Sequence, residues 1–291
     1  MVIDFHVHAF ADKIAERAIG ELRKNLREGG LDDAAYSDGT YSDTEAYFCR
    51  AGSGDGSGAG NRENYCAVFM PIATKPSQMT ICNNIAAGKN NYSVGGSKFW
   101  SFGSVFPKTS NPEELDAVLA ELSRIKSLGL YGIKLHPDYQ LFYPDDENVF
   151  PVYEKCAELG LPIMFHAGFD PISPKLTHAT PDRLLRVIEC FPNLVAIFAH
   201  MGGEDHWDEV YDLLCGKNCF IDTSYCAENM DSALMEKMIK KHGSERVLFG
   251  SDFPWKTPEI IVTKLLTLGL TEDDISNILY KNALKLINQG T

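Results

Sequence analysis

The stretch Ile3-Asp4-Phe5-His6-Val7-His8-Ala9 at the start of the chain decides the expected fold and site. Successive side chains of a β-strand point to opposite faces, so His6 and His8 would project side by side from one face. Imidazole is the commonest metal-binding side chain near neutral pH, and two of them form half of a metal site. A pair of surface histidines near a terminus is the alternative for so short a pattern. The remaining ligands must come from later in the chain.

Seven further apolar runs have the length of strands. They cover residues 66–72, 99–106, 132–136, 162–166, 194–200, 219–224 and 247–252. Several are apolar throughout, which is typical of strands buried on both faces of a parallel sheet. Helical patterns alternate with these runs, at residues 77–87, 148–159, 207–215, 231–242 and 271–288 and after the Asn111-Pro112, Thr180-Pro181 and Thr257-Pro258 start signals. Eight alternations predict a closed (β/α)8 TIM barrel, with a doubly wound open sheet as the alternative.

Residues 11–64 interrupt this alternation after the first strand. Residues 12–28 have apolar side chains at helical spacing, which predicts an amphipathic helix. Residues 29–64 are rich in Gly, Ser and Asp, and the glycine-rich stretch 52–60 predicts a flexible surface loop. We therefore expect one domain over residues 1–291, a barrel with an insertion at 11–64. Whether the insertion covers the site or a neighbouring subunit stays open.

Composition narrows the class of protein. A chain of 291 residues with 44% hydrophobic content is long enough for one such barrel. A formal net charge of -13 argues against nucleic acid or an anionic membrane surface as a partner. The sequence has no apolar run of membrane-spanning length and no secretion signal at its start, and its eight cysteines are scattered. We expect a cytoplasmic enzyme with reduced thiols and a small-molecule substrate, and a homo-oligomer stays open.

Polar residues recur where the predicted strands end. They are His6, His8, Lys134, His136, His166, His200 and Asp252. In a barrel of this kind, functional residues lie at the C-terminal ends of the strands. One histidine there is commonly a packed residue, but repetition over five strands predicts a shared site.

The motifs around these residues resemble those of a known superfamily. They are Asp4-x-His6-x-His8, Gly132-Ile-Lys-Leu-His-Pro137, Phe165-His-Ala-Gly168, Ala199-His-Met-Gly-Gly203 and Gly250-Ser-Asp-Phe-Pro254. Together they resemble the motif set of the metal-dependent amidohydrolase superfamily, a TIM-barrel superfamily. Within it, they are most similar to the amidohydrolase-related branch, which includes aminocarboxymuconate semialdehyde decarboxylases. The resemblance covers residues 3–254.

The resemblance implies a set of site residues. Its metal ligands are His6, His8, His166 and Asp252, around a divalent ion that is most often zinc in such enzymes. His200 is implied to polarise the substrate or move protons, or to bind a second metal ion in binuclear relatives. Lys134 is either a carboxylated bridge between two ions or a cation that meets a substrate carboxylate. Lys134 and His136 are therefore the candidate substrate-binding residues.

The implied ion suggests the chemistry. Zinc with an open position lowers the pKa of bound water to about 7. Asp252 would then serve as ligand and general base, and His200 would stabilise charge on a substrate oxygen. The expected function is a metal-dependent hydrolase of a small amide, ester or lactone. The alternatives are a non-oxidative decarboxylase of a small unsaturated or aromatic acid, and a non-catalytic metal-binding barrel.

Overall fold

Parallel strands form the centre of the molecule. The computed structural model describes residues 1–28, 35–53, 65–171, 173 and 176–289. Within these residues, eight strands pair in parallel, in the order β1 (Val2–Val7), β2 (Tyr65–Phe69), β4 (Ser97–Ser101), β5 (Ile133–Leu135), β6 (Ile163–Phe165), β7 (Ala196–Phe198), β8 (Phe220–Asp222) and β9 (Val247–Leu248). Each agrees in position with one of the predicted strands.

Backbone hydrogen bonds close these strands into a barrel. Regular pairing gives one sheet that begins with β1 and a second that runs from β5 to β9. The β9 and β1 strands meet where Phe5 N donates to Phe249 O at 2.8 Å, and β4 meets β5 where Gly103 N donates to Gly132 O at 2.8 Å. The predicted (β/α)8 architecture is therefore confirmed.

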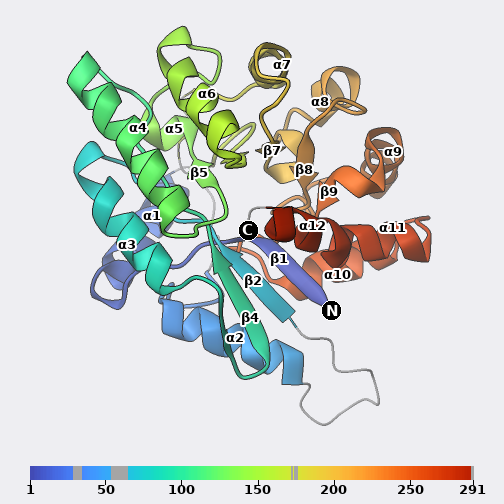
Figure 1. Cartoon of the computed structure of the whole chain (residues 1–291). Coiled ribbons are helices and arrows are strands. Elements are labelled where there is room, and N and C mark those ends of the chain that lie inside the picture. Colours follow the sequence, from blue (N-terminus) through green and yellow to red (C-terminus); the bar gives the residue numbers. More distant parts are fainter. Residues whose placement is uncertain (29–34, 54–64, 172, 174–175, 290–291) are drawn as a thin grey trace.

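Helices surround the barrel (Figure 1). They are α3 (Met79–Gly88), α4 (Pro112–Ser127), α5 (Pro137–Gln140), α6 (Phe150–Leu159), α7 (Pro181–Cys190), α8 (Trp207–Leu213), α9 (Ser232–His242), α10 (Pro258–Leu266), α11 (Glu272–Ser276) and α12 (Asn282–Gln289). Proline at the first position starts several of them, and Asn111 caps α4 by accepting from Glu114 N at 2.9 Å. In the described part of the chain, no helix is both long and apolar enough to cross a membrane.

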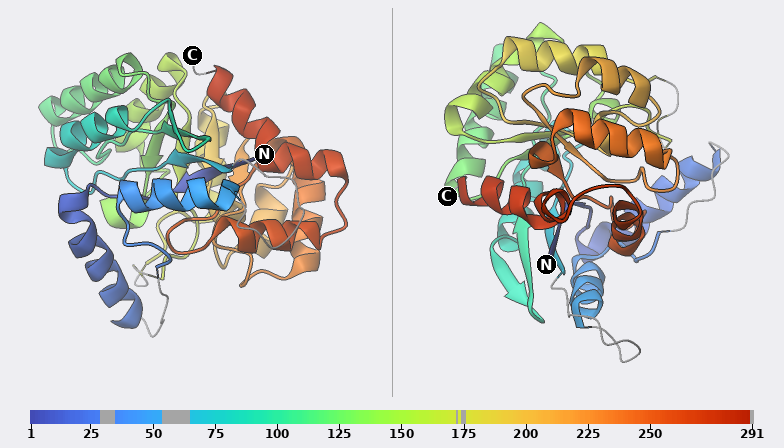
Figure 2. Two further views of the ribbon diagram at one scale, coloured as in Figure 1. Left: turned by 90° about the horizontal axis from the view of Figure 1, so that it is seen from below. Right: turned by 90° about the vertical axis from the view of Figure 1, so that its right-hand side faces the viewer.

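The insertion after β1 contains two helices. The predicted helix is α1 (Asp12–Glu28), and it projects beyond the ring of helices (Figure 2). The helix α2 (Tyr41–Ser53) was not predicted, and its last two residues were wrongly placed in the loop predicted at residues 52–60. Its Phe48 is fully buried against Phe253, so tertiary packing stabilises a helix in a segment that is rich in polar residues. From residue 54 onward, the loop predicted at residues 52–60 lies outside the described residues.

The irregular pairing of β1 explains how its histidines reach the barrel interior. The register between β1 and β2 shifts between Asp4 and Val7. Phe5 packs in the interior apolar cluster, whereas Val7 packs in the cluster between strands and helices. A bulge of this kind changes which side chains face inward. Beside β4, the antiparallel strand β3 (Tyr92–Val94) forms a short hairpin that was not predicted.

Candidate metal centre and active site

The structure brings three of the predicted ligands together. His6 lies on β1, His8 directly follows it, and Asp252 follows β9. The Nε2 atoms of the two histidines lie 3.1 Å apart, and Asp252 Oδ1 lies 3.4 Å from the His6 nitrogen and 3.2 Å from the His8 nitrogen. All three ligand atoms lie within 4.8 Å of one another. Groups from the two ends of the chain thus meet at one end of the barrel.

The hydrogen bonds behind these ligands show that the group fits a cation. His8 Nδ1 lies 2.8 Å from Met70 O, which can only accept, so His8 Nδ1 carries the hydrogen and Nε2 presents a lone pair. His6 Nδ1 donates in the same way to Asp222 Oδ2 at 2.7 Å. Two imidazole lone pairs and a carboxylate oxygen therefore converge, which is a donor set that suits a first-row divalent metal ion.

Charges around the trio alter its protonation. Burial and the charge of Lys134 lower the pKa of His6 to about 4. Burial alone would raise the pKa of Asp252, but the His6 and His8 rings beside it bring that pKa below its ordinary value. His6 is therefore neutral and Asp252 is ionised at neutral pH, and these are the forms that bind metal.

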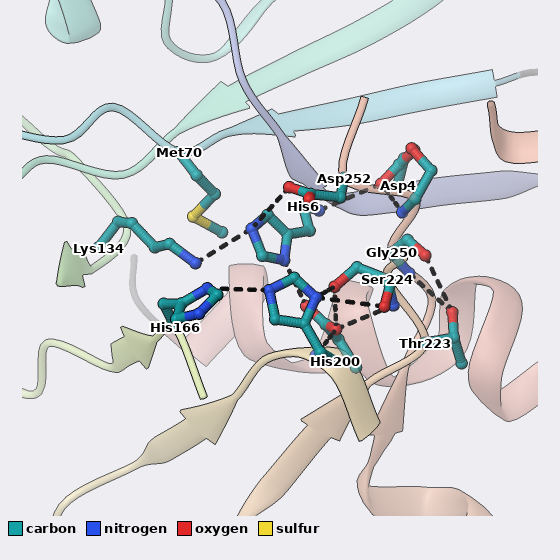
Figure 3. Close-up of polar contacts among 12 residues, drawn as sticks. Asp4, His6, Met70, Lys134, His166, His200, Thr223, Ser224, Gly250 and Asp252 are labelled. Atoms are coloured by element: carbon teal, nitrogen blue, oxygen red, sulfur yellow. Dashed lines mark hydrogen bonds and ion pairs between the residues drawn. The ribbon is translucent and has the colours of Figure 1, made fainter. Parts of the chain in front are cut away.

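Lys134 projects from β5 toward the trio (Figure 3). Its Nζ lies 3.0 Å from His6 Nε2, and the side chain is buried. Burial lowers the pKa of Lys134 to about 8, while the charges of Asp222 and Asp252 oppose that effect. Lys134 therefore supplies a positive charge beside the ligand atoms.

His200 and His166 form a second pair next to the trio. His200 Nε2 lies 3.1 Å from His166 Nδ1, and the His200 ring centroid lies 5.4 Å from that of His6. The ring nitrogens of His166 do not belong to the close group formed by His6, His8 and Asp252. Its role as a fourth ligand stays a prediction. The His136 ring stacks on the His166 ring, and their ring centroids lie 4.0 Å apart.

Asp222 is the main site residue that the sequence analysis missed. Besides His6, it binds the His200 loop, because its Oδ1 accepts from His200 N at 2.9 Å and from Ser224 Oγ at 2.5 Å. Burial alone would raise its pKa, but the charge of His6 and these hydrogen bonds lower it. Asp222 directly follows the apolar pair Phe220-Ile221. The same pattern, an apolar run that ends in a polar residue, identified His200.

Asp4 was part of a quoted motif but had no assigned role. It is fully buried, and it accepts hydrogen bonds from Ser251 N at 3.0 Å and from Ser251 Oγ. Burial raises the pKa of Asp4 to about 8. Asp4 thereby ties β1 to the segment that carries Asp252, so its role is to position the ligands.

Comparison with known proteins identifies several that are similar to this chain. The chain is 25% identical over 206 residues to 2-amino-3-carboxymuconate-6-semialdehyde decarboxylase of Dictyostelium discoideum, and the match covers 59% of this chain but only 57% of that relative. An uncharacterised TIM-barrel protein from Bordetella bronchiseptica superposes with a TM-score of 0.72 at 18% identity, over 99% of both chains.

A further solved structure is a dihydroxybenzoic acid decarboxylase from a Polaromonas species with bound manganese and the inhibitor 2-nitroresorcinol. It has a TM-score of 0.65 at 16% identity and covers 100% of this chain and 97% of its own. At such identities the structural likenesses show the fold. Residues 103–288, more than half of the chain, match the sequence pattern of the amidohydrolase family. The chain therefore belongs to the amidohydrolase family of enzymes.

Proposed function

We propose that the protein is a metal-dependent, non-oxidative decarboxylase of a small unsaturated or aromatic carboxylic acid. The observation that carries this proposal is the sequence match to a decarboxylase, together with the converging trio His6, His8 and Asp252. The manganese-containing decarboxylase of the same fold adds support. These likenesses favour decarboxylation over the hydrolysis that we expected from the motifs.

The ligands have separate tasks in this proposal. His6, His8 and Asp252 would hold one divalent cation, with His166 as the predicted fourth ligand. When bound, the cation would supply positive charge to bind and orient an anionic substrate. Zinc and manganese both suit nitrogen and carboxylate ligands. Lys134 adds a second positive charge, so an anionic carboxylate is attracted to this end of the barrel.

The reaction needs a proton but no oxidant. Carbon dioxide leaves with the carboxyl carbon, its bonding electrons stay on the substrate carbon, and a proton takes the vacated position. Asp252 is ionised at neutral pH because its pKa is lowered. It can therefore accept a proton from a water molecule or a protonated substrate group and then deliver that proton to the vacated carbon. Ser224 Oγ gives its hydrogen to Asp222, so it accepts from His200 Nδ1 at 2.9 Å and orients the His200 ring. The Nε2 atom of this neutral ring then carries a lone pair and can accept a hydrogen bond from a protonated substrate group.

The test uses one purified sample, loaded separately with zinc and manganese after chelation. We expect carbon dioxide release from an aromatic and unsaturated acid panel, and little turnover of an ester and lactone panel. Asp252→Asn should lower kcat by about 100-fold or more. Asp208→Asn, which changes an exposed acid in the first turn of α8, is the matched control.

Two results would overturn the proposal. Ester or lactone hydrolysis without carbon dioxide release would identify a hydrolase. Absence of both activities in protein that binds no metal would identify a non-catalytic barrel.

A further inference from the structure

Glu204 occupies a fixed position between two strand ends of the site. It follows the segment His200–Gly203 after β7, and its backbone pairs with the segment after β6. Glu204 N donates to Ala167 O at 3.0 Å, and Phe169 N donates to Glu204 O at 2.9 Å. Glu204 therefore lies between the strand ends that carry His166 and His200, at the end of the barrel where substrates bind.

The two segments cross too closely for the Glu204 backbone to move alone. Gly168 has φ +81°, and a Cβ atom on it would lie 2.1 Å from Glu204 N. Only glycine fits this crossing. This close contact and the two hydrogen bonds fix the position of the Glu204 backbone relative to the segment after β6.

The side chain of Glu204 is buried with one oxygen unused. The residue is 4% exposed, and its Oε1 accepts from Asn229 Nδ2 at 3.2 Å. Its Oε2 is buried and has no hydrogen-bond partner among the described residues. Buried polar atoms are almost always hydrogen-bonded, so each exception needs an explanation, and a catalytic role is one of them. Because Glu204 lies at the substrate-binding end of the barrel, its unused oxygen is a candidate for contact with substrate.

The surroundings keep this carboxyl group neutral. Burial raises the pKa of Glu204 to about 8. The hydrogen bond from Asn229 and the charge of Lys256 lower the pKa of Glu204, whereas the charges of Asp205 and Asp252 raise it. Glu204 in turn raises the pKa of the buried Cys226 thiol. Lys256 Nζ donates to Glu228 Oε2 at 2.7 Å and lies over the Tyr225 ring. At neutral pH, Oε2 therefore carries a hydrogen and is a donor.

We infer that Glu204 donates a hydrogen bond from Oε2 to a substrate oxygen other than the departing carboxylate. That oxygen belongs to a hydroxyl or carbonyl group on the unsaturated acid. A neutral acid suits such an acceptor, because a second carboxylate would be drawn instead to Lys134 and the cation. This inference rests on the proposed function and adds to it an oxygen-substituted substrate class.

The protonation state can be measured without turnover. Infrared difference spectra between wild type and Glu204→Gln should contain a protonated carboxylic acid band at pH 7 that fades as the pH rises through about 8. Asp205→Asn, which changes the exposed neighbouring acid, should leave that band in place. Absence of the band at pH 7 overturns the inference whatever reaction the protein catalyses.

The recognised oxygen can be tested with 2-hydroxybenzoate and benzoate, measured by calorimetry on manganese-loaded protein. Wild type should bind the hydroxylated acid about tenfold more tightly, the size of one hydrogen bond. Glu204→Gln should keep this preference because its amide donates, and Glu204→Leu should lose it. An unchanged preference in Glu204→Leu overturns the inference. If Glu204→Leu does not fold, the same binding experiment is repeated at pH 9.5 with wild type and Glu204→Gln. Loss of the preference for 2-hydroxybenzoate in wild type, but not in Glu204→Gln, would support the inference. Retention of the preference in wild type would overturn it.

Discussion

At the scale of single residues, Asp222 determines how the metal ligands are oriented. One oxygen accepts from His6 Nδ1, and the other accepts from the backbone of His200. The same carboxylate therefore sets the tautomer of a ligand and the position of the neighbouring catalytic candidate. Groups that hold metal-binding histidines commonly matter nearly as much as the ligands.

We predict that Asp222→Asn weakens metal binding by about 10- to 100-fold. An amide can still accept one hydrogen bond, but it does not provide the negative charge that stabilises His6 as an Nδ1 donor. Competition with a chelator of known affinity measures the change, and Asp208→Asn is the control. An unaltered affinity would show that the His6 ring is held by packing alone.

His242 makes a pH-dependent contribution to stability far from the site. It is fully buried, its Nε2 donates to Cys219 O at 3.0 Å, and its Nδ1 accepts from Gly216 N at 3.2 Å. The ring must therefore be neutral in the folded protein, and burial with the charge of Arg246 lowers its pKa from 6.5 to about 4. Between these two values, the unfolded chain binds a proton that the folded protein does not.

Stability should therefore rise with pH across this window. From pH 7 to pH 5, His242 alone should remove about 2 kcal/mol from the free energy of unfolding. His242→Gln, which keeps one donor and one acceptor, should flatten that part of the profile in urea titrations at each pH. Equal slopes in both proteins would assign the pH dependence to other groups.

The sequence revealed some site residues and hid others for a physical reason. His166, His200 and Asp252 each end an apolar run, so the topology of a barrel predicted their location. Glu204 and Asp138 have no such signal. Asp138 binds His178 Nδ1 at 2.7 Å across 40 residues of sequence, and only the folded loops bring such residues together.

At the scale of elements, the crossing of the segments after β6 and β7 joins two parts of the site. Gly168 and Glu204 form an isolated parallel bridge there. Gly160, at the end of α6, also has a positive φ of 62°, but a Cβ on it would meet nothing within 4 Å. The two glycines thus separate the effect of backbone conformation from that of close contact.

Gly168→Ala should destabilise the protein by about 3 kcal/mol or more, because its Cβ collides with backbone atoms. Gly160→Ala should cost about 1 kcal/mol, the penalty of the left-handed conformation alone. Urea unfolding measures both. Similar losses in the two variants would mean that the crossing relaxes easily.

Element prediction succeeded where apolar periodicity was regular. The barrel strands and the helices between them follow directly from that pattern. The helix α2 was missed because its sequence is polar and lacks a regular apolar pattern, and contacts of Phe48 with Phe99 and Phe253 stabilise it in the folded protein. The register shift in β1 was also invisible, since a period of two does not reveal where one residue is inserted.

At the scale of the whole molecule, the candidate metal site bridges the place where the barrel closes. His6 and His8 lie on and just after the first barrel strand, and Asp252 follows the last. The two strands are otherwise joined there by backbone hydrogen bonds such as Phe5 N to Phe249 O and Asp252 N to His6 O, at 2.8 and 2.9 Å. A bound cation would therefore link the first and the last strand of the barrel.

Metal binding should consequently protect the junction between β9 and β1 from opening more than the junction between β4 and β5. We call these two junctions the seams of the barrel. With manganese at about 100 times its dissociation constant, opening that breaks the site should slow by about 100-fold. Hydrogen exchange should slow strongly at the amides of Phe5 and Asp252, which join β9 to β1. It should slow less at Gly103 and Tyr131, whose amides join β4 to β5. Equal slowing at both seams would mean that the barrel opens only as a unit, and no slowing in wild type would mean that these residues do not hold the ion.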